Sequence, residues 1–177
     1  MKFSLSVAVG NYDRTRALVD GRVRIDGVNP AFMTLSPEEM FFRAFRHADF
    51  DITELSLASY AVSLANDANE YTALPIFLSR AFRHSSIYVT HESGIQKPEQ
   101  MRGKRIGIAE YQLTANVWAR ALLEDDYGVS PSEIVWVRGG MDAPVRPEKL
   151  RLDLPSDVRF EAVQPGETLN LLLTQGC

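Results

Sequence analysis

Strand-like and helical segments alternate along this chain of 177 residues, and the alternation occurs twice. Such an alternation is typical of parallel β-sheets, because parallel strands need a long crossover connection that is usually a helix. In the first half, strands are predicted at residues 3–9, 23–25, 32–35 and 50–55, and helices at residues 37–48 and 59–66. In the second half, strands are predicted at residues 105–109 and 134–137, and helices at residues 114–127 and 167–175. The sequence therefore predicts an α/β fold with a largely parallel sheet.

The restart of the pattern after residue 94 predicts two lobes, residues 1–88 and 89–177, with a ligand cleft between them. Only Gly176 and Cys177 follow the last helix, so we expect the second lobe to be incomplete and to expose an unpaired sheet edge. Residues 141–155 contain Pro144, Pro147 and Pro155 and are expected to be irregular.

Two of the helices have clear boundary signals. Ser36 is a predicted N-cap, with Pro37 in the first turn and Glu39 placed to complete a capping box. The helix at residues 114–127 is expected to end at Gly128. Its apolar stripe is predicted to consist of Val117, Trp118, Ala121 and Leu122.

Charge and composition limit the classes of function. The net charge is −4 and the chain lacks a basic block, which argues against binding to nucleic acid or to an anionic membrane surface. No apolar run approaches the roughly 20 residues that span a bilayer, and the N-terminus lacks a signal-peptide pattern, so a cytoplasmic location is expected. The single cysteine, Cys177, excludes an internal disulfide and a zinc cluster built on thiolates. A small molecule is the expected partner.

The pentapeptide Arg-Ala-Phe-Arg-His occurs twice, at residues 43–47 and 80–84. The first copy lies in a predicted helix and is interpreted as helical surface. The second copy precedes a β-rich segment, where side chains alternate between faces, so Arg80 and His84 would share one face and Arg83 the other. Because a guanidinium fits a carboxylate bidentately, the second copy predicts an anion site.

Further candidates follow predicted strands, at the edge where open α/β sheets place ligands. Each has a structural alternative. The candidates after the first strand would then only form a turn, Glu54 would pair with a nearby arginine, and Thr114 would be a helix N-cap. His91 and Glu92 resemble a metal pair but have no spaced companions. The candidate substrate-binding residues are Asn11, Tyr12, Arg14, Ser56, Tyr111, Gln112 and Thr114.

Three longer motifs, at residues 10–16, 80–85 and 110–120, resemble the 4,5-dihydroxyphthalate decarboxylase family. The resemblance extends along essentially the whole chain. It implies the type II periplasmic-binding-protein-like fold, in which two α/β lobes close on a small ligand. A member of this family is expected to continue past Cys177, which suggests either a truncated fragment or a short chain completed by a partner, such as a second copy.

The resemblance implies conversion of 4,5-dihydroxyphthalate, a small aromatic dicarboxylate, to 3,4-dihydroxybenzoate and carbon dioxide. Each carboxylate lies para to a hydroxyl. A deprotonated phenol therefore raises the electron density on the ring carbon that bears the carboxylate, and this carbon must be protonated before carbon dioxide leaves. Such chemistry does not strictly require an organic cofactor, and the sequence shows no metal-ligand set. Arg80 and Arg83 are assigned to carboxylate binding and His84 to proton transfer.

Two alternatives remain at this stage. The same arginines would serve a solute-binding module that captures a small anion without chemistry, because most proteins of this fold are receptors. A non-catalytic sensor or remnant is the second alternative.

Overall fold

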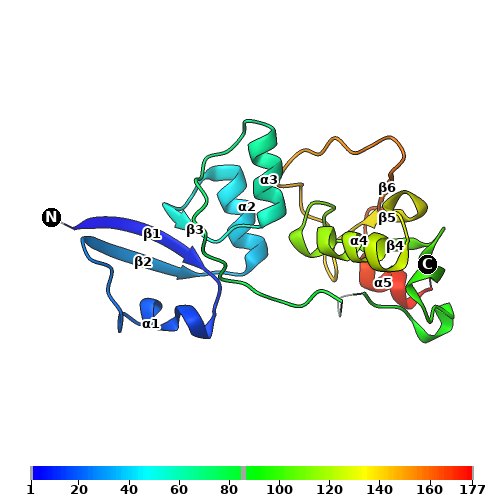
Figure 1. The fold of residues 1–177 in the computed structure, drawn as a ribbon, viewed down its shortest axis with the longest axis horizontal. Helices are drawn as coiled ribbons and strands as arrows, with labels where there is room; N and C mark the ends of the chain where they lie inside the picture. Colours follow the sequence, from blue (N-terminus) through cyan, green and yellow to red (C-terminus); the bar gives the residue numbers. More distant parts are fainter. Residues whose placement is uncertain (1, 85–86, 177) are drawn as a thin grey trace. The chain divides into compact units, whose positions relative to one another are not determined.

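The computed structural model describes residues 2–84 and 87–176, and the chain divides into two units, Met1–Ala81 and Phe82–Cys177 (Figure 1). Each unit contains a three-stranded parallel sheet with helices packed on it, which confirms the predicted α/β class. Ser85, Ser86 and Cys177, on which parts of the sequence interpretation fall, lie outside the described residues. Within the described residues, no helix is both long enough and apolar enough to cross a membrane.

The sheet of the first unit has the order β2-β1-β3. Strand β1 (Phe3–Val9) lies in the centre and pairs along its whole length with β2 (Val28–Thr34), whereas β3 (Ile52–Thr53) pairs only with its carboxyl end. The strand predicted at residues 23–25 is wrong, and the strand predicted at residues 32–35 is only the end of β2. Pairing with β1 determines where β2 begins, and this long-range effect is not visible in the local pattern.

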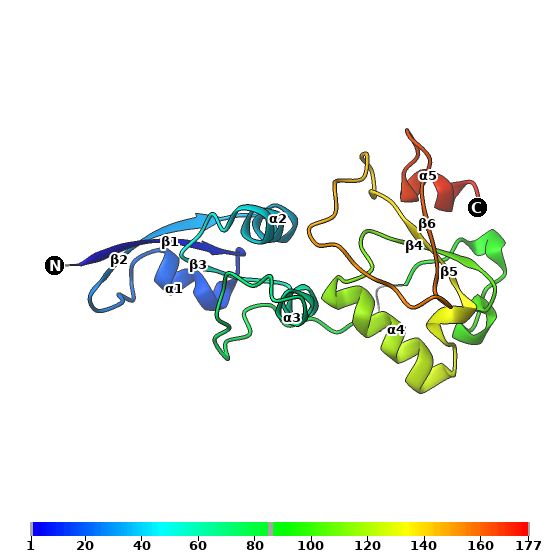
Figure 2. The ribbon, with the colours of Figure 1, turned by 90° about the horizontal axis from the view of Figure 1, so that it is seen from above.

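Two helices pack beyond the carboxyl ends of β1 and β2, as both views show (Figures 1 and 2). Helix α2 (Pro37–His47) begins at the predicted cap, where the Ser36 hydroxyl accepts a 3.3 Å hydrogen bond from the Glu39 backbone N–H. Helix α3 spans Leu57–Ala65. A 3₁₀ turn, η1 (Asp13–Thr15), leads into the short helix α1 (Arg16–Val19). The buried core of this unit consists of Ala8, Met40, Ala44 and Phe50.

The sheet of the second unit has the order β4-β5-β6. Its strands are β4 (Arg105–Ile108), β5 (Val135–Arg138) and β6 (Arg159–Ala162). Strand β6 was not predicted, because its four residues include Arg159 and Glu161 and follow the irregular segment that begins at Met141. The sheet therefore has a strand that the sequence pattern did not reveal, and it precedes the last helix rather than following it.

Helix α4 (Thr114–Tyr127) and helix α5 (Leu169–Thr174) lie on opposite sides of this sheet (Figure 2). The bounds of α4 match the prediction, and Gly128 takes the left-handed conformation that ends it. The predicted apolar stripe is wrong: Val117 is 38% and Trp118 55% exposed, whereas Leu123 is only 2% exposed. The buried core on this side consists of Met101, Ile108, Leu123, Val129, Ile134 and Trp136.

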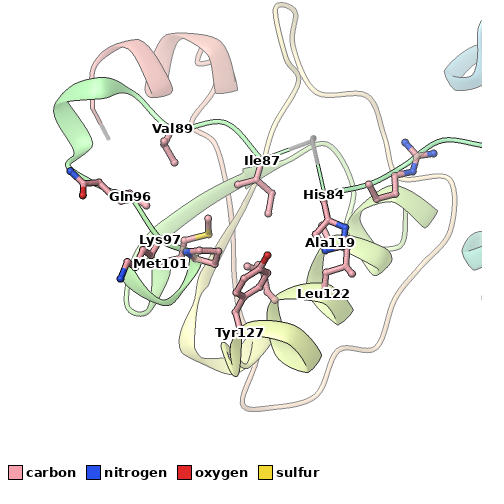
Figure 3. Close-up of a pocket in the computed structure, with 13 residues that line it drawn as sticks. His84, Ile87, Val89, Gln96, Lys97, Met101, Ala119, Leu122 and Tyr127 are labelled. Atoms are coloured by element: carbon pink, nitrogen blue, oxygen red, sulfur yellow. The ribbon is translucent and has the colours of Figure 1, made fainter.

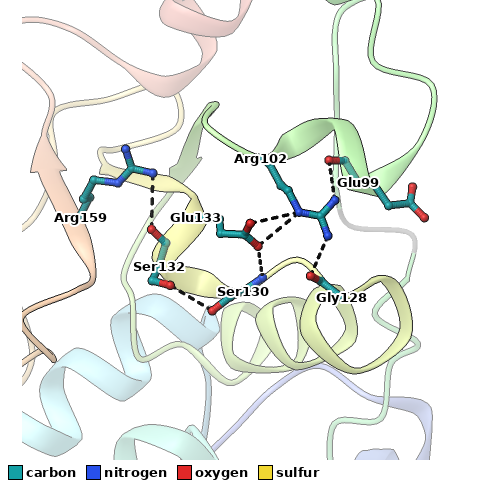
Figure 4. A network of polar contacts seen from close by, with 7 residues as sticks. All are labelled: Glu99, Arg102, Gly128, Ser130, Ser132, Glu133 and Arg159. Atoms are coloured by element: carbon teal, nitrogen blue, oxygen red, sulfur yellow. Dashed lines mark hydrogen bonds and ion pairs between the residues drawn. The ribbon is translucent and has the colours of Figure 1, made fainter.

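A network around Arg102 joins two 3₁₀ turns of the second unit to the end of helix α4 (Figure 4). Its guanidinium contacts the Glu133 carboxylate at 3.2 and 3.3 Å and donates to the backbone carbonyl of Gly128, just past α4, at 2.8 Å. It also bonds the carbonyl of Glu99 at 3.3 Å. The network fixes the 3₁₀ turns η3 (Pro98–Met101) and η4 (Pro131–Glu133) against the end of α4. A third such turn, η2, spans His91–Ser93.

The extended segment expected at residues 76–89 is not a strand in the part of the chain that is described. Residues 76–84 and 87–89 are irregular, and neither sheet pairs with them. Apolar and aromatic composition favours a strand, but a strand also needs a hydrogen-bonding partner. The face alternation assigned to Arg80, Arg83 and His84 therefore does not apply.

Candidate functional site

A partly open pocket of about 220 Å³ lies within the second unit, and both Arg83 and His84 line it (Figure 3). One face of α4 contributes Ala119, Leu122, Leu123 and Tyr127 to its wall. These positions share a face because residues three and four apart are neighbours on a helix. The remaining lining residues come from the segments on either side of η2 and from η3: Ile87, Val89, Ile95, Gln96, Lys97, Pro98 and Met101.

The lining combines an apolar interior with cationic and hydrogen-bonding groups at its edges. An apolar cavity of about 150 Å³ is known to hold benzene, so this pocket has room for one substituted ring. Arg83 supplies positive charge and His84 supplies an imidazole ring, whereas Lys97 lines the wall with its ammonium turned away. This combination suits an aromatic acid better than a purely apolar ligand or a bare inorganic anion.

His84 is held by two neighbours. Its imidazole stacks on the Phe82 ring with the centroids 5.0 Å apart, and its Nε2 lies 3.3 Å from Oδ2 of Asp126 on α4. The histidine side chain is 37% exposed and the aspartate 52% exposed, so the pair remains in exchange with solvent. Asp126 thus has a position beside the pocket that the sequence analysis did not predict.

The two arginines of the second pentapeptide are placed differently. Arg83 is half-buried and lines the pocket together with His84. Arg80 is exposed and belongs to the first unit. The sequence interpretation paired Arg80 with His84, but in the structure Arg83 shares the pocket with the histidine, because the chain here is irregular rather than extended.

In the first unit, Glu54 organises the carboxyl end of β1. Its carboxylate accepts a 2.9 Å hydrogen bond from the Tyr12 hydroxyl and a 3.2 Å hydrogen bond from the Gly10 backbone N–H. Burial, together with the bond to Glu54, raises the pKa of Tyr12, so the phenol stays protonated at neutral pH. The sequence interpretation expected Glu54 to pair with an arginine, but its carboxylate accepts hydrogen bonds from Tyr12 and Gly10 instead.

The other candidates of the first unit also have partners within the unit. The Asn11 side-chain oxygen accepts a 2.6 Å hydrogen bond from Arg16. The Arg14 guanidinium lies 5.0 Å from the centroid of the Tyr12 ring and 3.6 Å from the Asp13 carboxylate. Ser56 is buried as the N-cap of α3 and accepts from the Ser59 backbone N–H at 3.5 Å.

In the second unit, Tyr111 packs inside an aromatic cluster. Its ring meets Trp136 and Phe160 edge-on, with centroids 6.0 and 5.8 Å apart. The Arg120 guanidinium lies 3.6 Å from the Tyr111 ring centroid and donates to its backbone carbonyl at 2.7 Å. Burial raises the pKa of Tyr111 and lowers the pKa of Arg120. Tyr111 therefore packs in the interior of the unit.

A buried polar cluster lies just past β4. Lys149 Nζ contacts Glu110 Oε2 at 2.6 Å, with the two side chains only 4% and 13% exposed. Gln112 is also buried, and its amide donates to Glu110 Oε2 at 3.2 Å. Nothing in the sequence pattern signalled Lys149, because it lies in an irregular segment. Thr114 is the first residue of α4 and Leu113 occupies the N-cap position, so the predicted Thr114 cap is wrong.

Over residues 2–84 and 87–176, no group of three or more histidine, cysteine, aspartate or glutamate side chains could hold a metal ion.

The chain is closely similar in sequence to two known enzymes. The chain is 57% identical over 175 residues to a 4,5-dihydroxyphthalate decarboxylase from Comamonas testosteroni. It is 56% identical over 175 residues to a 4,5-dihydroxyphthalate decarboxylase from Pseudomonas putida, and each match covers 99% of this chain. The chain belongs to the 4,5-dihydroxyphthalate decarboxylase family. The resemblance found in the sequence motifs is thereby confirmed.

The chain spans about half the length of one relative in this family. The matched residues make up 53% of the Comamonas protein and 68% of the Pseudomonas protein. No protein-family model matches the chain.

Proposed function

We propose that this protein decarboxylates 4,5-dihydroxyphthalate, or a closely related hydroxylated aromatic acid, and that the pocket beside His84 binds the ring. The observation that supports the reaction is the identity of 56–57% along 99% of the chain to two proteins of that name. The apolar pocket with cationic edges supports the choice of site. We further propose that the two units are the two lobes of a type II periplasmic-binding-protein-like fold.

In this proposal Arg83 binds a carboxylate while Leu122, Leu123 and Met101 contact the ring. A deprotonated ring hydroxyl pushes electron density onto the para carbon that bears the other carboxylate. His84 then transfers a proton to that carbon, the bond to the carboxylate breaks, and its electrons restore the aromatic ring as carbon dioxide leaves. The reaction consumes one proton, which solvent returns to the partly exposed imidazole.

The remaining candidates stay predictions within the same proposal. Arg80 is exposed in the first unit, and Asn11, Tyr12, Arg14, Ser56, Tyr111, Gln112 and Thr114 have the surroundings described above. A cytoplasmic location and association with a second copy also stay predictions, which cell fractionation and light scattering would test.

The proposal is tested by incubating the 177-residue chain with 4,5-dihydroxyphthalate and measuring carbon dioxide and 3,4-dihydroxybenzoate. His84→Asn should lower kcat by about 10²- to 10⁴-fold, the range for loss of a general acid, with little change in affinity. Arg83→Ala should weaken binding by roughly 10- to 100-fold, because a charge-assisted hydrogen bond is lost.

The duplicated pentapeptide provides a matched control, since His47 is its histidine in the first unit, on α2. His47→Asn should leave turnover unchanged. If the kcat of His84→Asn stays within twofold of that of the unmodified chain, the histidine has no part in the reaction. Stoichiometric binding with no release of carbon dioxide would instead support a receptor that captures the anion without chemistry.

A further inference from the structure

Tyr127 lines the pocket but has no role in the proposed reaction. Tyr127 is the last residue of α4, and its ring packs against the core of the second unit. In Figure 3 the ring rises from the helix, and its hydroxyl oxygen points into the space between Met101 and Ala119. The phenol is thus a polar group among apolar neighbours.

The Tyr127 hydroxyl is available to a ligand. Among the described residues it has no hydrogen-bond partner, and two polar groups near the pocket are directed elsewhere. Asp126 faces His84, and the Lys97 ammonium points away from the cavity. A hydroxyl aimed into an apolar pocket favours ligands that carry a matching oxygen, because a ligand without one leaves the hydroxyl unpaired.

We propose that Tyr127 is a specificity-determining residue, whose phenol donates a hydrogen bond to a ring oxygen of the bound acid and so selects hydroxylated benzene carboxylates over unhydroxylated ones. This inference rests on the proposed function, because it assumes that the pocket binds the aromatic substrate. It adds a recognition element for the ring hydroxyls to the carboxylate contact assigned to Arg83.

The test compares two dianions that differ only in their ring hydroxyls, 4,5-dihydroxyphthalate and phthalate, by isothermal titration calorimetry at pH 7. The 177-residue chain carries His84→Asn throughout, so that the hydroxylated acid is bound and not consumed. With Tyr127 in place this chain should bind the hydroxylated acid about five- to tenfold more tightly, the value of one net hydrogen bond. Tyr127→Phe keeps the ring and should abolish this preference while leaving the affinity for phthalate unchanged.

Tyr88→Phe is the matched control, because Tyr88 is 77% exposed and does not line the pocket, although its neighbours Ile87 and Val89 do. It should keep the full preference. If Tyr127→Phe keeps the preference for the hydroxylated acid, the inference is overturned and the proposed function stands. The same holds if Tyr127→Phe loses equal affinity for both acids, because that result indicates a packing role for the ring. Binding of neither acid at millimolar concentration would overturn the pocket assignment of the proposed function itself, and the inference with it.

Discussion

Identical residues have different surroundings in the two copies of Arg-Ala-Phe-Arg-His. In the first copy, Arg43 bridges Glu39 at 3.5 Å and Asp49 at 2.8 Å and lies over the Phe50 ring. The bond to Asp49 raises the pKa of Arg43, and the two ion pairs give the arginine a structural role on α2. The prediction of a helical surface is thus confirmed for this copy. In the second copy Arg83 and His84 line a pocket, and only the tertiary structure distinguishes the two copies.

A residue-scale prediction concerns Asp51. Its carboxylate accepts hydrogen bonds from the backbone N–H and the hydroxyl of Ser6, both at 2.7 Å, and these bonds lower the pKa of Asp51. Because the folded-state pKa is lowered, this stabilisation is complete above the unfolded value of about 3.9 and is lost as the pH falls through the lower folded value.

We therefore expect Asp51→Asn to be less stable than the unmodified chain at pH 7, with the difference vanishing near the acid end of a titration. Urea unfolding midpoints between pH 6 and pH 2.5 would measure it. Asp26→Asn, which changes an exposed turn carboxylate, is the control. A difference in stability that stays constant with pH would contradict the expected role of Asp51.

Elements with strong local signals were predicted well, and elements defined by pairing were not. The helical pattern of α4 is long and ends at a glycine, so its bounds were predicted correctly. Strands β2 and β6 depend on partners far away in sequence, so local propensity misplaced the first and missed the second. The inward face of α4 was also wrong, because Leu123 packs on the sheet in place of Trp118.

An element-scale prediction concerns the packing of α5 on the second sheet. A Cβ at Gly139, just past β5, would lie 2.7 Å from Val163 Cγ1 and 2.9 Å from Leu169 Cδ2, so the end of the strand and the helix approach closely. Gly139→Ala should lower the free energy of unfolding by about 1–3 kcal/mol, the usual cost of overpacking. Chemical denaturation measures this change.

Leu169→Ala in the same chain removes one of the two close contacts of the added methyl and leaves the contact with Val163. The double variant should therefore be more stable than the sum of the two single changes predicts. Strict additivity would contradict the contact with Leu169 as a cause of the lost stability.

For the molecule as a whole, the α/β class could be predicted from the alternating pattern. The lobes expected at residues 1–88 and 89–177 stay a prediction, and the structure divides the chain between Ala81 and Phe82. The candidate pocket could be predicted only in part. His84 and Arg83 carry recognisable chemistry, but Tyr127 and Asp126 acquire their positions from the end of α4, which no sequence spacing relates to residue 84.

A whole-molecule prediction follows from the boundary between the units. Phe77 and Phe82 are 58% and 77% exposed in irregular backbone, which is the form of chain that proteases enter first. Limited chymotrypsin digestion should cut here and leave two fragments close to the two units in mass. Mass spectrometry identifies the cuts.

Replacing both phenylalanines by serine should delay cleavage and shift it to other sites. If the earliest cuts fall instead within residues 141–158, the connection between the units is better protected than its exposure indicates.

The pocket is assembled from one continuous stretch, since its lining begins at Arg83 and ends at Tyr127. The two relatives match the same number of residues, 175, yet differ in total length, because these residues form 53% of one and 68% of the other. The walls nevertheless depend on residues that come later in the chain, because Glu133 holds η3 through Arg102 and Leu123 packs with Ile134 and Trp136. A chain cut just after Tyr127 would therefore keep every lining residue and lose the support that positions them.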